Sequence, residues 1–495
     1  LPGDQSILLG PDGPSLGGFV CSVTTAKGEM WKLGQLHPGD KVHFRLLDLD
    51  QAKEIREAEE ANLRHEYQEV VLPEQKDLDY HYAILAEETA AGTKIVARLD
   101  GEDNILVEYG EMELDIAIRF RVHVLMQELK KKDLPVIDLT PGIRSLQIHF
   151  DIKKISLKEM LAAVLETNRT LPELSDVTVP SRIIWLPLSW DDPQTQLAAK
   201  RYQQTVRPNA PWCPSNPEFI RRINGLDSIE DVKKIVFDAD YLVLGLGDVY
   251  LGAPVATPVD PRHRMVTTKY NPARPWTPEN AVGIGGAYLC VYGMEGPGGY
   301  QFVGRTIQMW NPLKETEYFK HGKPWLLDFF DQIRFYPVSA EEILKDREDF
   351  LRGRFKIKIE ETSFNLGKYE QFLKEHEDTI RAFKDHQEAS FEAERKMWKE
   401  KGLDEFDSET QDAPAIVEET VPDGCEAART NIPGSVWKVL VEDGQKVREG
   451  DTLVILESMK MEFPVTAEYS GIIEKVYLKP GEQVNSGQLA ASIRV

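Results

Sequence analysis

Lys460 lies between Met459 and Met461 near the carboxyl end of the chain, at a point where the sequence predicts the tip of a β-hairpin. The apolar segments 453–456 and 463–465 on either side of it are predicted strands. Two methionines beside a lysine in a turn put apolar surface where solubility disfavours it. Most lysines in turns are only solvated, but this pattern indicates an amine that another protein recognises.

Several residues between 260 and 310 have types suited to binding a small polar or anionic ligand. The pair Gly298-Gly299 permits positive φ angles and close approach of backbone N–H groups to a ligand oxygen, although a tight connection between strands is its commoner role. Arg305 follows on a predicted strand and is a candidate for holding an anion, with a surface ion pair as the alternative. Weaker candidates for the walls of the same site are Tyr300, Gln308 and Asn271, while His263 is as readily a loop residue as a base.

The elements that position these residues belong to a long, acidic chain. Its 495 residues are too many for one ordinary core and predict about three domains. Lys and Arg number 59 and Asp and Glu number 82, a net charge of −23 that disfavours general binding to nucleic acid or an anionic membrane surface. No apolar run is long enough to span a membrane. The four scattered cysteines lack metal-site or disulfide spacing and favour a reducing, cytoplasmic compartment.

The carboxyl-terminal segment contains an internal repeat. Residues 434–444 recur as 471–481, an offset of 471 − 434 = 37, and Val447 and Val484 continue the same register. Each copy consists of a predicted strand, a glycine turn and a second predicted strand. The pair therefore predicts a flattened barrel with approximate two-fold symmetry, and the hairpin falls between the two copies.

The rest of the chain divides into α+β, barrel and helical parts. Strands are predicted at 105–109 and 146–150 and helices at 114–129 and 156–167, a pattern that favours a small α+β sandwich. Between 404 and 423 there are eight acids and no Lys or Arg, which is typical of a solvated linker. The first predicted domain, 1–60, has short strands up to about residue 50 and a helical connector at 48–64. The second, 80–335, has an α+β subdomain at 80–175 and a strand-rich barrel at 176–335 that a helix at 217–224 interrupts. A helical extension at 336–401 follows, which begins with a capping box at Ser339 and includes one helix over 366–401, and then come the linker at 402–424 and the terminal domain at 425–495.

Residues 425–495 resemble a biotin carboxyl carrier domain, and Met459-Lys460-Met461 matches that family's biotinylation motif. Lipoyl domains are similar in fold but typically lack the paired methionines. The resemblance implies biotin bound covalently to Lys460, attached by a biotin protein ligase, on an arm that carries a carboxyl group between two active sites. The acidic linker then sets the effective concentration of this arm.

Residues 80–335 resemble the family named for allophanate hydrolase subunit one, which also occurs in 5-oxoprolinase components. Three segments carry the resemblance: PGIRSL at 141–146, GIGG at 283–286 and PGGYQFVGRT at 297–306. The resemblance implies a cyclophilin-like β-barrel. The expected fold class is therefore α+β and strand-rich, with a barrel carboxyltransferase, a small α+β subdomain and a final biotinyl-type barrel.

Residues 1–50 are similar to the carboxyl-terminal end of the partner subunit-two family, through Leu16–Phe19 and Leu36–Asp40. A partner-like segment, a subunit-one-like region and a biotin carrier in this order resemble the urea carboxylase family. The resemblance implies transfer of a carboxyl group from carboxybiotin on Lys460 to urea, giving allophanate, with no metal in this half-reaction. ATP and magnesium belong to a biotin carboxylase domain, which 1–420 does not resemble, so we expect a partner domain in the same or a separate chain.

Asp248 is the first candidate for holding urea. It stands in the segment 245–252, where related 5-oxoprolinase components usually have an aromatic residue followed by proline. A carboxylate accepts two N–H bonds from urea, and such charge-assisted bonds are strong; a turn aspartate bonded to its own backbone is the alternative. The candidate catalytic groups are therefore Asp248, Arg305 and Tyr300, and the candidate substrate-binding groups are Asp248, Gly298, Gly299, Gln308 and Asn271.

Two other functions fit the same pattern. A guanidine carboxylase has the same architecture and an equally planar acceptor rich in N–H groups. A binding or regulatory module of the subunit-one type is the non-catalytic alternative, and the biotinylation motif argues against it because such a module has no use for a carboxyl arm.

Overall fold

The computed structural model describes residues 23–37, 40–69, 78, 80–90, 92–247, 251–404, 421–422, 424–432, 434–458 and 461–495. Contacts divide the chain into two units. The first comprises Leu1–Val179 and Phe364–Phe372, and the second comprises Pro180–Ser363 and Leu373–Val495.

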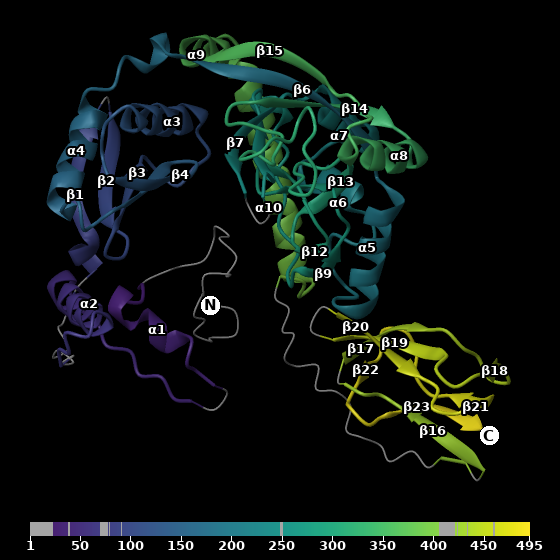
Figure 1. The fold of residues 1–495 in the computed structure, drawn as a ribbon. Coiled ribbons are helices and arrows are strands. Elements are labelled where there is room, and N and C mark those ends of the chain that lie inside the picture. The colour runs from purple at the N-terminus through teal and green to yellow at the C-terminus, as the bar shows by residue number, and fades with distance from the viewer. Residues whose placement is uncertain are drawn as a thin grey trace. The chain divides into compact units, whose positions relative to one another are not determined.

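An antiparallel five-stranded sheet with helices packed on it forms most of the first unit (Figure 1). Its elements are η3 (Tyr80–Ala83), β1 (Ile84–Ala90), β2 (Thr93–Leu99), β3 (Asn104–Tyr109), α3 (Ile116–Lys130), β4 (Val136–Pro141), β5 (Ser145–Phe150), α4 (Leu157–Arg169) and η4 (Leu174–Asp176). The strand order is β1-β2-β3-β5-β4. Along β3, Ile105, Val107 and Tyr109 are fully buried and alternate with half-buried residues, so one face of the sheet packs against α3. The strands predicted at 105–109 and 146–150 and the helices predicted at 114–129 and 156–167 are confirmed.

The described part of the segment before this sheet consists of helices joined by irregular chain. It contains η2 (Lys27–Glu29), the single turn α1 (Met30–Leu33) and α2 (Leu49–Leu63), which a capping box at Asp48 begins. The helical connector is confirmed, but the short strands expected here are wrong for 23–37 and 40–48. A strand needs a partner that accepts its backbone hydrogen bonds, and no described strand pairs with this segment.

A closed barrel forms the centre of the second unit. Its strands are β6 (Thr178–Trp190), β7 (Tyr241–Leu246), β8 (Pro254–Pro258), β10 (Ala281–Gly285), β11 (Tyr288–Val291), β13 (Gln301–Arg305) and β14 (Gln332–Val338), with β15 (Lys358–Asn365) added beside β6 and a separate ribbon of β9 (Arg274–Thr277) and β12 (Gly296–Gly298). The order around the ring is β13-β10-β11-β8-β7-β14-β6, and pairing between β6 and β13 closes it. All these ladders are antiparallel except that of β6 with β14.

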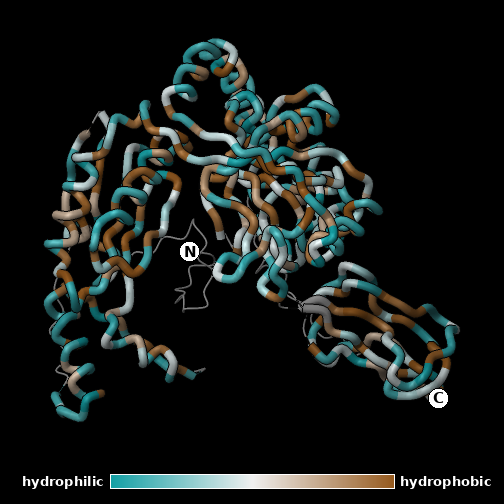
Figure 2. Tube along the Cα trace, turned by 45° about the horizontal axis from the view of Figure 1, so that its top comes forward, coloured by the Kyte–Doolittle hydropathy of each residue, from teal (hydrophilic) through white to brown (hydrophobic). Residues whose placement is uncertain are grey.

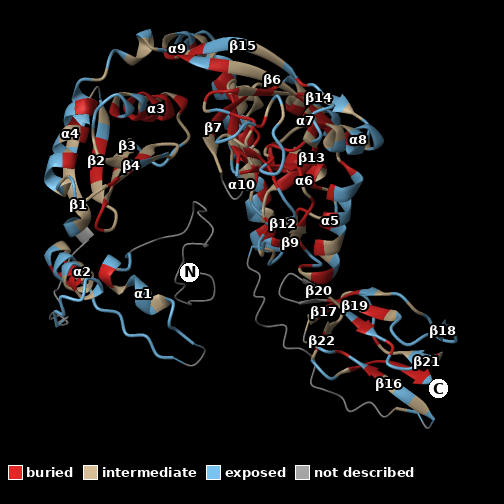
Figure 3. Ribbon diagram, viewed as in Figure 1, coloured by how far each residue is buried: buried red, intermediate tan, exposed pale blue. Residues whose placement is uncertain are grey.

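Apolar side chains fill the barrel. Ile184, Leu186 and Leu188 are fully buried and recur at every second position of β6, so they point to the same side of the strand. Hydrophobic residues follow the barrel strands in Figure 2, and the same strands are the most deeply buried part of this unit in Figure 3. The predicted strand-rich barrel, and with it the α+β fold class, is confirmed.

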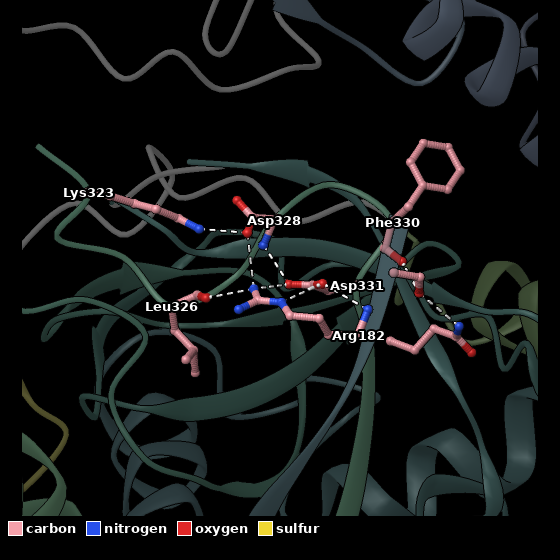
Figure 4. Close-up of polar contacts among 8 residues, drawn as sticks. Arg182, Lys323, Leu326, Asp328, Phe330 and Asp331 are labelled. Carbon is pink, nitrogen blue, oxygen red and sulfur yellow. Dashed lines mark hydrogen bonds and ion pairs between the residues drawn. The ribbon is translucent and has the colours of Figure 1, made fainter. Parts of the chain in front are cut away.

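Arg182 ties the start of β6 to the loop before β14 (Figure 4). Its backbone N–H and Nε donate to Asp331 at 3.2 and 3.0 Å, and Nη2 donates to the carbonyl of Leu326 at 3.0 Å. Asp328 accepts bonds from Arg182 at 3.1 Å and from Lys323 at 2.6 Å. Burial raises the pKa of the Asp331 carboxyl, and Arg182 opposes this shift by favouring the ionised form. These bonds hold the two parallel strands in register.

Helices surround the barrel. They are α5 (Pro193–Thr205), α6 (Asn216–Ile223), α7 (Ile229–Asp238), α8 (Ala340–Leu351) and α10 (Glu377–Glu400), with the short turn η5 (Pro261–His263), while α9 (Leu366–Glu375) belongs mostly to the first unit. The helix predicted at 217–224 and the capping box at Ser339 are confirmed. The single helix expected over 366–401 is wrong, because His376 leaves the helical region at φ −112° and ψ 12° and separates α9 from α10.

The carboxyl-terminal domain consists of two small sheets. Its strands are β16 (Cys425–Arg429), β17 (Gly434–Val439), β18 (Lys446–Val447), β19 (Thr452–Ser458), β20 (Met461–Thr466), β21 (Gly471–Val476), β22 (Gln483–Val484) and β23 (Leu489–Arg494). The sheets have the orders β16-β23-β21-β18 and β20-β19-β17-β22. The repeat is confirmed, since β17 and β21 begin its two copies and β18 and β22 continue them with Val447 and Val484 both buried.

Candidate functional site

The turn that joins β12 to β13, residues 298–300, brings several predicted site residues together. A side chain at Gly298 would lie 2.5 Å from Oγ1 of Thr277 and 2.7 Å from the hydroxyl of Tyr292, so only glycine fits. The carbonyl of Gly299 accepts a bond from the Tyr270 backbone N–H at 2.7 Å. Neither glycine of the pair has a positive φ, so the turn uses them for close packing rather than for a left-handed backbone.

Tyr300 packs its ring on the barrel. A Cβ at Gly285 would overlap this ring, and one at Gly283 would lie 2.9 Å from the Tyr300 Cβ. The backbone N–H of Tyr300 donates to the hydroxyl of Tyr292 at 3.2 Å. Its carbonyl accepts a bond from Arg274 at 2.6 Å. Both backbone groups of Tyr300 are therefore held by buried side chains, which fixes the end of the turn.

Arg274 is fully buried beneath this turn. Its guanidinium lies between two aromatic rings, 4.1 Å from the centroid of Tyr270 and 3.8 Å from that of Phe302. It also donates to Oγ1 of Thr277 at 3.4 Å, whereas its Nε is buried without a hydrogen-bond partner. Arg274 is not among the residues predicted from the sequence, and neither is the need for small residues at Gly283 and Gly285. The GIGG motif was the available signal, since it marks a strand that another group approaches closely.

Asn271 lies next to the same turn. It is exposed, and its carbonyl accepts a bond from Nη1 of the buried Arg207 at 2.8 Å. The structure thus brings Asn271, Gly298, Gly299 and Tyr300 into one neighbourhood.

Arg305 and Gln308 form a second group. Arg305 is 7% exposed at the far end of β13, and its Nε donates to the carbonyl of Glu279 at 2.8 Å. Gln308 donates to the carboxylate of Glu279 at 2.9 Å and to the carbonyl of Gly293 at 2.8 Å. Arg347 also pairs with the Glu279 carboxylate. Burial lowers the pKa of Arg305, and the nearby charge of Arg347 lowers it further.

The two groups are separate. Five residues of extended chain from Tyr300 to Arg305 span about 16 Å. A single small ligand therefore does not bridge the turn and the Arg305 group, and the second group has the character of a buried ion network.

Asp248 lies outside the described residues. On one side of it, the backbone N–H of Gly247 donates to the carbonyl of Ala253 at 2.8 Å. On the other, Gly252 leaves no room for a Cβ beside Trp325. His263 is half-buried in η5, a turn that Asp260 caps.

The hairpin of the terminal domain is described except at its tip. β19 and β20 pair from Thr452 with Thr466 to Ser458 with Met461. Met461 begins β20, and Met459 and Lys460 lie outside the described residues. The core behind the hairpin is aliphatic, with Leu453, Val454 and Leu456 of β19 fully buried.

Three domain families match the chain. They are the carboxyltransferase domain, subdomains A and B, over residues 1–46; the carboxyltransferase domain, subdomains C and D, over residues 95–319; and the biotin-requiring enzyme domain over residues 420–493. With the closed barrel and the double sheet, these matches define a carboxyltransferase region joined to a domain that carries covalent biotin.

None of the described helices has the length and apolar character that a bilayer crossing requires.

Relatives that align with nearly the whole chain specify this class of biotin-dependent carboxyltransferase further. The chain is 37% identical to the urea amidolyase of Lachancea kluyveri and 36% identical to that of Saccharomyces cerevisiae, in both cases over 99% of this chain and 27% of the relative. The solved structure of Kluyveromyces lactis urea carboxylase matches with a TM-score of 0.78 at 37% identity, over 97% of this chain and 42% of that one. Over its whole length the chain is homologous to part of the urea carboxylases and urea amidolyases. It spans about a quarter of the length of the two urea amidolyases.

Proposed function

We propose that this chain performs the second half-reaction of a urea carboxylase, a C–N-forming ligase: it transfers a carboxyl group from biotin on Lys460 to urea and gives allophanate. The observation that carries the proposal is the alignment of 99% of the chain with urea amidolyases, across the partner-like segment, the barrel and the carrier together. A binding module of the barrel alone has no need for the carrier.

The turn at 298–300 is the proposed centre of the acceptor site. Its backbone is held on both sides by Tyr270, Tyr292 and Arg274, with the Tyr300 N–H donated to Tyr292, so the turn and the half-buried Tyr300 side chain meet a ligand without reorganising. Asn271, exposed beside the turn, supplies a polar wall. Urea nitrogen is a poor nucleophile, so exclusion of water, close approach and stabilisation of developing negative charge must do most of the catalysis.

Asp248 is the proposed ligand for the N–H groups of urea, because a carboxylate accepts two such bonds and fixes the plane of the molecule. Arg305 and Gln308 are proposed to contact an anionic carboxyl group at a separate position, about 16 Å along β13 from the turn, rather than within the urea site itself. Their bonds to Glu279 leave Nη1 and Nη2 of Arg305 as the groups that would reach a ligand.

Biotin fits the described part of the hairpin. Pairing of β19 with β20 up to Ser458 and Met461 leaves Met459 and Lys460 between the paired ends, which suits a short turn that a biotin protein ligase recognises. When bound, biotin supplies the carboxyl group. A biotin carboxylase domain that uses ATP and magnesium is the proposed partner, and a reducing cytoplasm suits the free cysteines Cys213, Cys290 and Cys425.

The test uses the chain together with its biotin carboxylase. We expect urea-dependent ADP release from the wild type, one added biotin in the mass of the intact protein, and loss of both on Lys460→Arg. Asp248→Asn is expected to keep the biotin but to lower turnover with urea by about a hundredfold, because one charged acceptor of N–H bonds is lost.

Guanidine is the control acceptor. A tenfold or greater preference for guanidine over urea would replace urea carboxylase by guanidine carboxylase as the function. A chain that remains unbiotinylated beside a competent ligase would instead support the non-catalytic module.

A further inference from the structure

Lys269 is an exposed lysine whose side chain is held in one place by the turn at 298–300. A Cβ at Gly299 would lie 3.3 to 3.8 Å from the Cβ, Cγ and Cδ atoms of Lys269, so the lysine stem lies directly on this glycine. Its Nζ is 5.2 Å from the centroid of the Tyr300 ring. Among the described residues, no carboxylate forms an ion pair with Lys269. The ammonium therefore carries a positive charge that no described acid neutralises.

The backbone on both sides of Lys269 is fixed. Thr267 and Gly286 exchange two backbone hydrogen bonds of 3.0 Å. The carbonyl of Thr268 accepts a bond from the side chain of Gln301 at 2.9 Å, and the Tyr270 N–H bonds the Gly299 carbonyl at 2.7 Å. The backbone and the stem of Lys269 are thus held before any ligand binds, so little conformational entropy is lost when its ammonium contacts one.

Arg274 adds a second positive charge to the same turn. It is fully buried, bonds the Tyr300 carbonyl and forms no ion pair with a described carboxylate. A buried charge without a counterion is unfavourable, and a nearby anion would offset this cost. Lys269 and Arg274 thus place two cations at one turn of a chain whose net charge is −23.

We propose that Lys269 binds the carboxylate of the reaction product at this turn, so that the site holds an N-carboxylate such as allophanate in preference to neutral urea. The inference rests on the function proposed above, and it adds to the proposed site a residue, Lys269, that the sequence did not indicate. Arg274 acts from below as a positioning residue, because it fixes Tyr300 and contributes its charge without reaching the surface. Urea has no negative charge, so Lys269 distinguishes the two molecules by charge rather than by shape.

Isothermal titration calorimetry of the 495-residue chain with allophanate and, separately, with urea tests this role. Lys269→Met is expected to weaken allophanate binding by about tenfold or more, the size of one charge-assisted hydrogen bond, and to change urea binding less than about twofold. Lys269→Arg keeps the charge and should stay within about threefold of the wild type for allophanate. Added salt should weaken allophanate binding in the wild type more than in Lys269→Met.

Lys358 provides the matched control. Its Nζ also lies over an aromatic ring, 4.7 Å from the centroid of Trp185 on the barrel, but it pairs with Glu360, so Lys358→Met removes a cation that is already neutralised and should leave both ligands unaffected. If Lys269→Met binds allophanate as tightly as the wild type while both ligands bind the wild type, the role of Lys269 is refuted and the proposed function stands. If the wild type binds neither urea nor allophanate, the proposed function and the role of Lys269 are both refuted.

Discussion

The barrel is a closed ring of strands and the carrier domain is a pair of small sheets; both have apolar interiors, but they bury different kinds of polar side chain. The barrel region buries charged and amide groups, among them Arg274, Gln301 and Arg305. In the described part of the carrier domain the buried polar side chains are the small hydroxyls of Thr430, Ser435 and Ser492. A transferase must build its site from side chains held in the interior, whereas a carrier needs only a stable base for one amine.

Glycine is also used differently in the two regions. At Gly283, Gly285 and Gly298 of the barrel, another group occupies the space of a Cβ. At Gly444 and Gly481 of the carrier, the two equivalent turns of the repeat, φ is +85° and +88°. At these positions the barrel requires glycine for its size, and the two carrier turns require it for backbone conformation, whereas Gly471 of the carrier also lacks room for a Cβ, which would lie 2.2 Å from the Arg494 carbonyl.

The largest expected effect comes from Arg274→Met, which should separate the two regions. Loss of the bond to the Tyr300 carbonyl frees the turn, and we expect turnover with urea to fall by about a hundredfold. Biotinylation should stay complete, because the carrier has its own core. Urea-dependent ADP release and an avidin blot measure the two responses. Loss of biotinylation in this variant would show that the carrier depends on the barrel interior.

A substitution of intermediate effect is Gly285→Ala. The added methyl overlaps the Tyr300 ring, and overpacking of this kind is expected to lower the free energy of unfolding by up to about 3 kcal/mol. Gly245→Ala on β7 is the control, since its Cβ would meet Val255 at an ordinary 3.4 to 3.7 Å. Thermal melting followed by circular dichroism compares the variants.

A glycine substitution in the carrier domain complements the two barrel substitutions Gly285→Ala and Gly245→Ala. Gly444→Ala meets no atom within 4 Å, so its expected cost of about 1 kcal/mol arises from the positive φ alone. Equal melting temperatures for Gly245→Ala and Gly285→Ala would contradict the distinction between glycines chosen for size and for conformation.

A further expected effect, which appears only at low pH, concerns His123 of the first unit, where ionisable groups are also buried. Burial, with the charges of Arg119 and Lys130, lowers the pKa of His123 to about 4. The unfolded chain has the ordinary value of about 6.5, so it binds more protons between these two values. Stability is thus complete above pH 6.5 and falls as the pH drops towards 4.

At pH 5 the expected loss is about 2 kcal/mol, and His123→Leu should remove it. Melting temperatures at pH 7 and pH 5 measure the effect. A wild type and a variant that lose stability in parallel would show that His123 is protonated in the folded state.

The parts of the fold that follow local rules were predictable. The carrier repeat and its hairpin were readable because each turn has its own glycine at a constant offset of 37 residues. The helices that begin at Ser156 and Ser339 were readable because both ends of each capping box stand three residues apart. The helix break at His376 was not, since the apolar spacing continues across it on one face.

Contacts between distant residues account for what the sequence did not reveal. Arg274 gains its environment from Phe302, which lies in another strand, and Lys269 gains its position from Gly299. In the sequence, Arg274 and Lys269 are isolated basic residues outside any motif, so nothing there indicates a shared site. The candidates Asn271, Gly298, Gly299 and Tyr300 could be found because they are glycines or polar residues close to motifs, but the distance of Arg305 from them follows only from the path of β13.

The boundary between the two units is crossed three times by the chain, after Val179, Ser363 and Phe372. A single proteolytic nick after Val179 leaves residues 364–372 with the first unit and still covalently joined to the second. A truncation after Val179 therefore removes residues 364–372 from the first unit, so a gene fusion or split-protein design of that unit must supply this short returning segment as well.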